Sequence, residues 1–171
     1  MLAWLAERVL AYGSVGVLTA VLLLPALEAA LPVIGAVLPG QSAVVLGGML
    51  AWHGTITVEA ALLTATAGAV LGNAAGYAIG RRWHRPLLER IPAGAPRRRY
   101  IEYALRLIER RGAGAVFVGR FVAVLRTLVP TLCGATRMPL RRYLLWTLAG
   151  SAVWAPSCVL IGYVLGPAGP G

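Results

Sequence analysis

The stretch Gly119–Met138, GRFVAVLRTLVPTLCGATRM, constrains the fold most, because it places two arginines inside an apolar run that a proline interrupts. At membrane depth each ionised arginine costs about 2.5 to 3.5 kcal/mol, so Arg120 and Arg126 need compensation. A buried carboxylate, a water-filled cavity, backbone carbonyls or an anionic ligand can supply it, and paired guanidinium groups suit phosphate. Alternatively, both side chains snorkel to one interface. Their separation, about 9 Å along a helix, allows this only if the segment does not span.

Composition places the whole chain in the membrane. Hydrophobic residues make up 58% of it and the mean hydropathy is +0.75, which indicates an integral membrane protein. The 171 residues predict a single membrane domain, residues 1–171. Ten of the sixteen arginines fall in residues 81–111, which indicates a cytoplasmic loop facing anionic lipid rather than nucleic-acid binding. Cys133 and Cys158 lack metal-ligand spacing, and we expect no metal or other cofactor.

Prolines break the apolar sequence in the first half of the chain, residues about 9–80. Val9–Leu27 is long enough to span a membrane. Leu38–Trp52 is too short, and a re-entrant hairpin over residues about 28–55, with two arms of about 10 residues, fits it better. Three prolines here predict irregular backbone that is buried in protein or lines a cavity: Pro25, Pro32 and Pro39.

A clear spanning helix is predicted next, at Ile56–Gly80, and its many small residues suit close helix packing. The polar residue in its middle, Asn73, is either an interhelical hydrogen-bonding group or a site residue. His53 marks the exit of the preceding hairpin, and we interpret it as an interfacial residue rather than a proton relay.

The basic loop, residues about 81–111, separates the two halves. Within it, Arg97–Arg111 has apolar residues at helical spacing, which predicts a cytoplasmic amphipathic surface helix. These residues are Tyr100, Tyr103, Ala104, Leu107 and Ile108. The second half, residues about 112–166, begins with the arginine-bearing hairpin, residues about 112–140, and ends in a spanning helix at Tyr143–Leu165.

The placement of arginines orients these elements. If the basic loop is cytoplasmic, Ile56–Gly80 runs inward, the first hairpin opens outward, the second opens inward, and the amino terminus is cytoplasmic. A weak repeat, GYAIG at 76–80 and GYVLG at 162–166, closes the two halves. We therefore expect an all-α integral membrane protein with about three spanning helices, two opposed re-entrant helical hairpins in inverted halves and a cytoplasmic amphipathic helix. Many secondary transporters build a midplane site in this way.

Several motifs in order carry a resemblance that covers about residue 25 to 166. They are Glu28, LPGQ at 38–41, GNAAGYAIGR at 72–81, GRFVAVLR at 119–126, Pro130, CGATRMP at 133–139 and GYVLG at 162–166. In order and spacing they resemble the DedA family, also called the SNARE-associated or VTT-domain family. The resemblance implies a multi-pass protein of the cell inner membrane that moves lipids between leaflets. Bacterial members are linked to recycling undecaprenyl phosphate, and others to scrambling phospholipids.

The resemblance also implies site residues. The family's membrane-embedded glutamate matches Glu28, and its two essential arginines match Arg120 and Arg126. The acidic residue usually found after the first Pro-Gly is Gln41 here, and the aspartate of the Gly-Asp-x-x-Gly-Tyr pattern is Asn73. An amide can hydrogen-bond but cannot carry a proton at physiological pH, so proton coupling would rest on Glu28 alone. Relatives usually continue into another helix beyond the end of this sequence.

The expected function is that of a flippase-like or scramblase-like lipid transporter rather than an enzyme. Arg120 and Arg126 would bind the phosphate of a lipid near the midplane, and Glu28 would hold them when no lipid is present. Positive helix ends at the two hairpin tips would assist, around Pro39 and Gly40 and around Pro130 and Thr131. The expected partners are membrane lipids, especially lipid phosphates, and a homo-oligomer stays open.

Two alternatives remain at this point. The same hairpins suit a transporter of a small ion or solute. An intramembrane enzyme acting on a lipid phosphate needs a nucleophile or base beside the arginines. His53 and His84 are the only histidines, and His84 falls in the basic loop.

Overall fold

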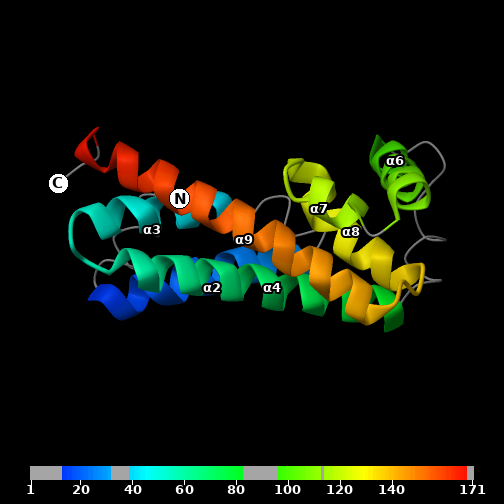
Figure 1. Ribbon diagram of the computed structural model, residues 1–171, viewed down its shortest axis with the longest axis horizontal. Helices are drawn as coiled ribbons and strands as arrows, with labels where there is room; N and C mark the ends of the chain where they lie inside the picture. Colours follow the sequence, from blue (N-terminus) through cyan, green and yellow to red (C-terminus); the bar gives the residue numbers. More distant parts are fainter. Residues whose placement is uncertain (1–12, 32–38, 83–95, 113, 169–171) are drawn as a thin grey trace.

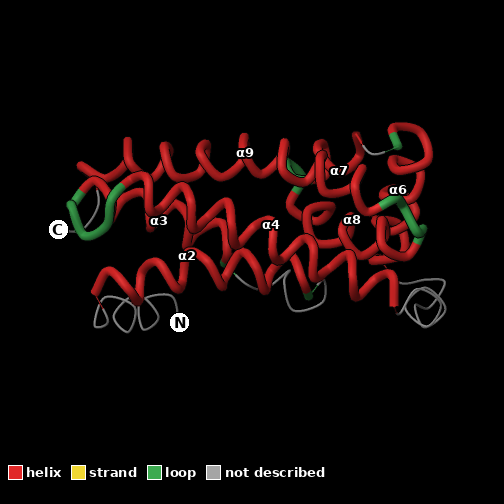
Figure 2. The backbone as a smooth tube through the Cα atoms, turned by 60° about the horizontal axis from the view of Figure 1, so that its bottom comes forward, coloured by secondary structure: helices red, strands yellow, loops and turns green. Residues whose placement is uncertain are grey.

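The computed structural model describes residues 13–31, 39–82, 96–112 and 114–168, and these residues are helical apart from short turns (Figure 2). The predicted all-α class is confirmed. Pro32 and His84 fall outside the described residues. In chain order the elements are α2 (Gly13–Ala30), α3 (Gly40–Trp52), α4 (Val58–Arg82), α6 (Pro96–Arg111), α7 (Gly114–Gly119), α8 (Ala123–Ala135), α9 (Leu140–Leu165) and the short 3-10 helix η1 (Gly166–Ala168).

Three of the described helices are long and apolar enough to cross a membrane: α2, α4 and α9. At 1.5 Å per residue, the 25 residues of α4 and the 26 of α9 extend for about 38 Å, against a hydrocarbon core of about 30 Å. A helix satisfies its backbone hydrogen bonds internally, which an apolar medium demands. In length and apolar composition, the described helices thus match the prediction of about three spanning helices.

Glycines on α4 set the direction of α2. Gly68 lies against the backbone of Leu22, and Gly72 lies against that of Ala26, so the two helices run in parallel (Figure 1). The predicted orientation, with a cytoplasmic amino terminus and an inward Ile56–Gly80, requires opposite directions and is wrong for α2. Residues before Gly13 lie outside the described part of the chain, so the side of the terminus itself stays a prediction.

After α2 the chain reverses direction, and α3 packs alongside α2. Gly40 lies against Glu28 and Pro25, and Gly47 lies against Val21, so α3 runs antiparallel to α2. The first hairpin therefore consists of α2 and α3, and its first arm is the helix that was expected to precede it.

Pro25 does not interrupt the backbone as predicted, because it lies inside α2. A proline removes one backbone donor, and the remaining hydrogen bonds hold a helix whose neighbours pack closely around it. Pro39 does precede a helix, as the N-cap residue of α3.

The second hairpin consists of α7, a turn at residues 120–122, and α8. Gly119, the last residue of α7, packs against Val129 of α8. Pro130 and Thr131 lie inside α8 rather than at the hairpin tip, so the tip predicted there is wrong. The actual tip contains Arg120, and the positive end of α8 lies at Ala123.

Two helix crossings share one construction, α4 with α8 and α9 with α3. In each, a glycine of either helix lies against a backbone carbonyl of the other, where a Cβ would have no room. The pairs are Gly80 with Thr131 and Gly134 with Tyr77, and then Gly162 with Val45 and Gly48 with Val159. The last helix of each half thus packs on the short helix of the other half. This arrangement fits inverted halves.

The repeat in the sequence is one helical turn out of register with this packing. GYAIG and GYVLG align Gly76 with Gly162, whereas Gly80 makes the contact that corresponds to that of Gly162. Gly76 instead lies against Ala29 and Pro130. The two halves are therefore related in architecture but differ by one turn along α4.

The amphipathic helix forms as predicted, at α6. Its buried residues, Ile101, Ala104 and Ile108, belong to a core cluster that includes residues of α7 and α8. Tyr103 was expected on the same face but is 53% exposed, because its position on the helix lies beside that face. The apolar face of α6 thus packs on the second hairpin.

The two hairpins approach from opposite ends of the bundle. Figure 1 shows α3 towards one end, and α6, α7 and α8 towards the other, with α4 and α9 running along the length of the bundle. The second end is basic, with exposed arginines at the end of α4 and the start of α9: Arg81, Arg82, Arg141 and Arg142. The first turns of α3 and α8 meet between the two ends, where Gln41 contacts Arg126.

Candidate functional site

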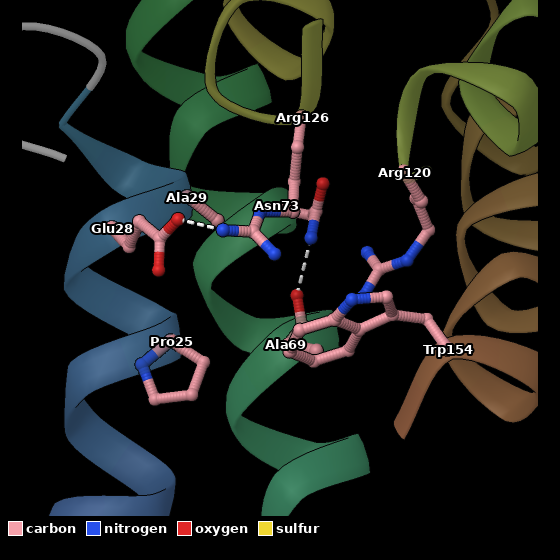
Figure 3. Close-up of a pocket in the computed structure, with 8 residues that line it drawn as sticks. All are labelled: Pro25, Glu28, Ala29, Ala69, Asn73, Arg120, Arg126 and Trp154. Atoms are coloured by element: carbon pink, nitrogen blue, oxygen red, sulfur yellow. Dashed lines mark hydrogen bonds and ion pairs between the residues drawn. The ribbon is translucent and has the colours of Figure 1, made fainter. Parts of the chain in front are cut away.

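A small cavity lies where the tip of the second hairpin, the first turn of α8, and helices α2, α4 and α9 converge (Figure 3). Its volume of about 10 Å³ is room for about one water molecule. Its lining residues are Pro25, Glu28, Ala29, Ala69, Asn73, Arg120, Arg126 and Trp154. The cavity therefore joins both arginines to the one glutamate that the sequence singled out.

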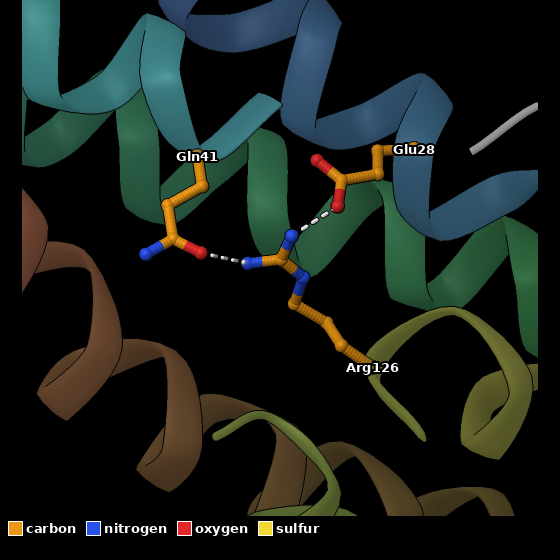
Figure 4. A network of polar contacts seen from close by, with 3 residues as sticks. All are labelled: Glu28, Gln41 and Arg126. Atoms are coloured by element: carbon orange, nitrogen blue, oxygen red, sulfur yellow. Dashed lines mark hydrogen bonds and ion pairs between the residues drawn. The ribbon is translucent and has the colours of Figure 1, made fainter. Parts of the chain in front are cut away.

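Arg126 is held by two partners from the first hairpin. Its Nη2 donates to Oε1 of Glu28, and its Nη1 donates to Oε1 of Gln41 at 3.1 Å (Figure 4). The Arg126 and Glu28 side chains keep only 11% and 7% of their surface exposed. A buried pair of opposite charges is costly to separate, because either partner alone would be an unpaired charge in an apolar medium.

Glu28 also faces the beginning of α3. Its Oε2 lies against Gly40, and its carboxylate accepts hydrogen bonds from the backbone amides of Gly40 and Gln41. The first amides of a helix have no partner within the helix and carry partial positive charge, so this end attracts an anion. Glu28 is thus the anion that partners two positively charged groups, the amino-terminal end of α3 and the guanidinium of Arg126.

Arg120 is the more deeply buried arginine, with 4% of its surface exposed. Its Nε and Nη1 have no hydrogen-bond partner among the described residues. The side-chain stem passes along Gly150 of α9, where a Cβ would come within 2.5 Å of the Arg120 Cδ. Arg120 therefore reaches the cavity with donors that no carboxylate in the described part of the chain occupies.

Trp154 contacts both arginines and was missed by sequence reasoning. The Cζ atoms of Arg120 and Arg126 lie 5.4 Å and 5.3 Å from the centre of its ring. A desolvated cation–π contact contributes about 2 kcal/mol, comparable to the insertion cost of one arginine. Gly150 and Trp154 are four residues apart, on one face of α9. That spacing is the signal that could have identified Trp154.

Asn73 lines the cavity from α4. Its Nδ2 donates to the carbonyl of Ala69 at 2.5 Å, one turn earlier in the same helix. The interhelical hydrogen bond at this position uses the backbone instead, because the Tyr143 hydroxyl donates to the Asn73 carbonyl at 2.9 Å. The side-chain amide of Asn73 therefore lines the cavity, and its Nδ2 is already engaged in a hydrogen bond within α4.

Three predicted residues lie elsewhere. Pro130 and Thr131 pack against Gly76 and Gly80 at the α4–α8 crossing rather than lining the cavity. His53 is exposed beyond the end of α3, which agrees with its interpretation as an interfacial residue. Within the described part of the chain, no group of His, Cys, Asp and Glu residues could hold a metal ion.

The charges that line the cavity do not cancel. Among the described residues that line the cavity, Glu28 is the one carboxylate that faces Arg120 and Arg126, which leaves one net positive charge in a mainly apolar surrounding. Such a site favours an anion, and the free donors of Arg120 match the oxygens of a phosphate or a carboxylate.

Comparison with known proteins agrees with the motifs. The family model described as the VTT domain matches residues 38–164. An uncharacterized membrane protein of Synechocystis is 39% identical over 134 residues, which cover 77% of this chain and 61% of that protein. The inner membrane protein YohD of Escherichia coli is 32% identical over 134 residues, 78% of this chain and 68% of YohD. The inner membrane protein YqjA of the same species is 32% identical over 136 residues, 77% of this chain and 60% of YqjA.

The chain spans about three fifths of the length of the Synechocystis protein and of YqjA. No solved structure is a significant match. The family model covers most of the sequence, including Gln41, Asn73, Arg120, Arg126 and Trp154. This chain therefore belongs to the VTT-domain, or DedA, family of membrane proteins.

Proposed function

We propose that this protein binds the phosphate of an anionic lipid between Arg120 and Arg126 and passes that lipid between the two leaflets. The observation that carries the proposal is the state of Arg120, which is buried with two nitrogens unpaired beside the cavity. Unpaired donors on a buried charge are costly, so a ligand that completes them gains free energy that offsets the cost of opening the site and displacing Glu28. A phosphate offers several acceptor oxygens to two guanidinium forks.

Entry of a lipid requires the site to open, because the cavity has room for about one water molecule. The phosphate then replaces the Glu28 carboxylate as the acceptor of hydrogen bonds from Arg126 and from the first amides of α3. One anion replaces another on the same positive groups, so the free-energy difference between the empty and loaded states is small. A small difference favours transport, which needs release as well as binding.

The arrangement of the hairpins supports access from both leaflets. α3 and α8 begin at the cavity and run to opposite ends of the bundle (Figure 1). Movement of the first hairpin opens the site toward one end, and movement of the second opens it toward the basic end. We place the basic end in the cytoplasm, because arginine-rich segments stay on that side.

The substrate class follows from the charge of the site. One net positive charge is neutralised by a phosphodiester, as in a phospholipid. A phosphomonoester, such as undecaprenyl phosphate, carries about 1.5 to 2 negative charges and is neutralised if Glu28 turns away or accepts a proton. Binding and release suffice for this function, and we propose no covalent step. The proposed location is the cell inner membrane, where YohD and YqjA are named.

A small inorganic anion is a second candidate, favoured by the small cavity. Both candidates are tested by reconstituting purified protein in liposomes and measuring two rates in parallel. One is the movement of a labelled short-chain phosphatidic acid between leaflets, and the other is the efflux of trapped inorganic phosphate. Lipid movement that Arg120→Gln abolishes supports the proposal. Phosphate efflux without lipid movement supports the second candidate and overturns the first.

A further inference from the structure

Two like charges share the cavity, and only one of them has a carboxylate partner among the described residues. Glu28 bonds Arg126, while Nε and Nη1 of Arg120 stay unpaired. The two guanidinium groups repel each other in a medium that screens charge poorly. Some other group must therefore hold Arg120 in place while no ligand is bound.

Trp154 is in the right place to do so. Figure 3 shows its indole extending from α9 towards the guanidinium groups of Arg120 and Arg126. Both Cζ atoms lie within 5.4 Å of the ring centre, and the Trp154 ring is buried. The stem of Arg120 is guided to this position along Gly150, on the same face of α9.

An aromatic ring holds a guanidinium differently from a carboxylate. It attracts the charge through its electron-rich face. The N–H donors of the guanidinium lie in its own plane, so face contact leaves them free. Glu28, in contrast, occupies an N–H of Arg126 that a phosphate has to take over.

Resting on the proposed function, we infer that Trp154 is a positioning residue that holds the arginine pair in the empty site and leaves the donors of Arg120 open to phosphate. The attraction of the ring is strongest while the arginine charge is not neutralised. It weakens once phosphate is bound. A ring with less electron density therefore destabilises the empty protein more than the loaded one, and by linkage it raises the affinity for phosphate.

The test replaces Trp154, by site-specific incorporation, with tryptophans that carry one, two or three ring fluorines. Fluorine withdraws electrons from the ring face with little change in shape, so a purely structural role predicts no graded response. The matched control is the same series at Trp146, two turns earlier on α9, whose ring packs against Phe117. Two quantities are measured in detergent: the Tm of the phosphate-free protein, and the affinity for short-chain phosphatidic acid and for inorganic phosphate.

At Trp154 we expect the Tm of the phosphate-free protein to fall with each fluorine, while the affinity for the phosphate probe rises up to about tenfold across the series. At Trp146 neither quantity should follow the number of fluorines. A flat Tm series at Trp154, or equal trends at the two positions, overturns the inference. If unmodified protein binds neither probe, the proposed function fails, and the Tm series still decides whether Trp154 holds the arginines.

Discussion

Arg126 donates a hydrogen bond to Glu28 across 98 residues of sequence, and this contact closes the site between the two hairpins. Arg126 lies in the first turn of α8, and Glu28 lies near the end of α2. The contact thus joins two elements that lead toward opposite ends of the bundle. Any ligand that takes Arg126 from Glu28 also loosens the two hairpins from each other.

Glu28→Gln should bind lipid phosphate more tightly but transport it more slowly. A neutral amide competes less well for Arg126 and for the first amides of α3, so a bound phosphate is displaced less readily. The measurements are the amount of lipid phosphate that co-purifies and the rate of lipid movement in liposomes. Glu59→Gln, at the exposed start of α4, is the matched control. Loss of both bound lipid and transport would show that Glu28 does not compete with the ligand.

The two arginines should respond differently to removal of their charge. Arg126→Gln strands Glu28 as a buried charge and should lower the free energy of unfolding by about 3 to 5 kcal/mol. Arg120→Gln strands no carboxylate seen in the structure, so stability should hold while lipid transport is lost.

Unfolding in detergent and lipid movement in liposomes separate these effects, with Arg141→Gln at the exposed start of α9 as the control. Arg120→Lys should also transport poorly, because a point charge does not replace a bidentate fork. Full transport by Arg120→Gln would exclude the phosphate clamp.

Gly80→Ala and Gly162→Ala should destabilise the protein to similar extents. In each, the new Cβ meets a backbone carbonyl across a helix crossing, that of Thr131 or that of Val45, and the helices must separate. Overpacking of this kind costs about 1 to 3 kcal/mol. Gly114→Ala is the control, because a Cβ there meets no atom within 4 Å. The loss of stability is measured by thermal unfolding in detergent. An unchanged Tm in either variant would contradict the crossing geometry.

The charged part of the site was predictable from the sequence because charge is conspicuous in an apolar chain. Glu28, Arg120 and Arg126 were expected together, and all three line the cavity. Trp154 was not expected, because an aromatic residue in a spanning helix is ordinarily a packing residue. Only its position beside two cations gives it another role.

The direction of α2 and the tip of the second hairpin were not predictable for a related reason. A hairpin arm and a spanning helix are equally apolar, so Val9–Leu27 gave no sign that α3 returns along it. The parallel course of α2 and α4 depends on contacts such as Gly72 with Ala26, which pair residues far apart in the sequence. A proline indicates a lost hydrogen bond, but Pro130 remains inside α8 because tight packing against Gly76 supports the helix there.

The two ends of the bundle should face opposite sides of the membrane, with the basic end in the cytoplasm. His53→Cys, beyond the end of α3, should react with a membrane-impermeant thiol reagent applied from outside. Arg82→Cys, at the end of α4, should react only after the membrane is opened. The unaltered chain is the control, since Cys133 and Cys158 are buried. The opposite labelling pattern would invert the orientation.

Gln41→Glu should weaken the binding of lipid phosphate and make it depend on pH. Gln41 accepts a neutral hydrogen bond from Arg126 at 3.1 Å, and a glutamate there becomes a second carboxylate on the same guanidinium. Charge-assisted hydrogen bonds contribute about 1.5 to 3 kcal/mol against about 1 for neutral ones, so the affinity for phosphate should fall about tenfold.

Acid should reverse the effect, because protonation of either carboxylate loosens its hold on Arg126. The variant should therefore bind short-chain phosphatidic acid more tightly as the pH falls, over a range in which the unaltered protein changes less. Gln41→Leu separates charge from hydrogen bonding, since it removes the acceptor and should bind at least as tightly as the unaltered protein. Equal affinity of the Glu and Leu variants at every pH would mean that residue 41 does not restrain Arg126.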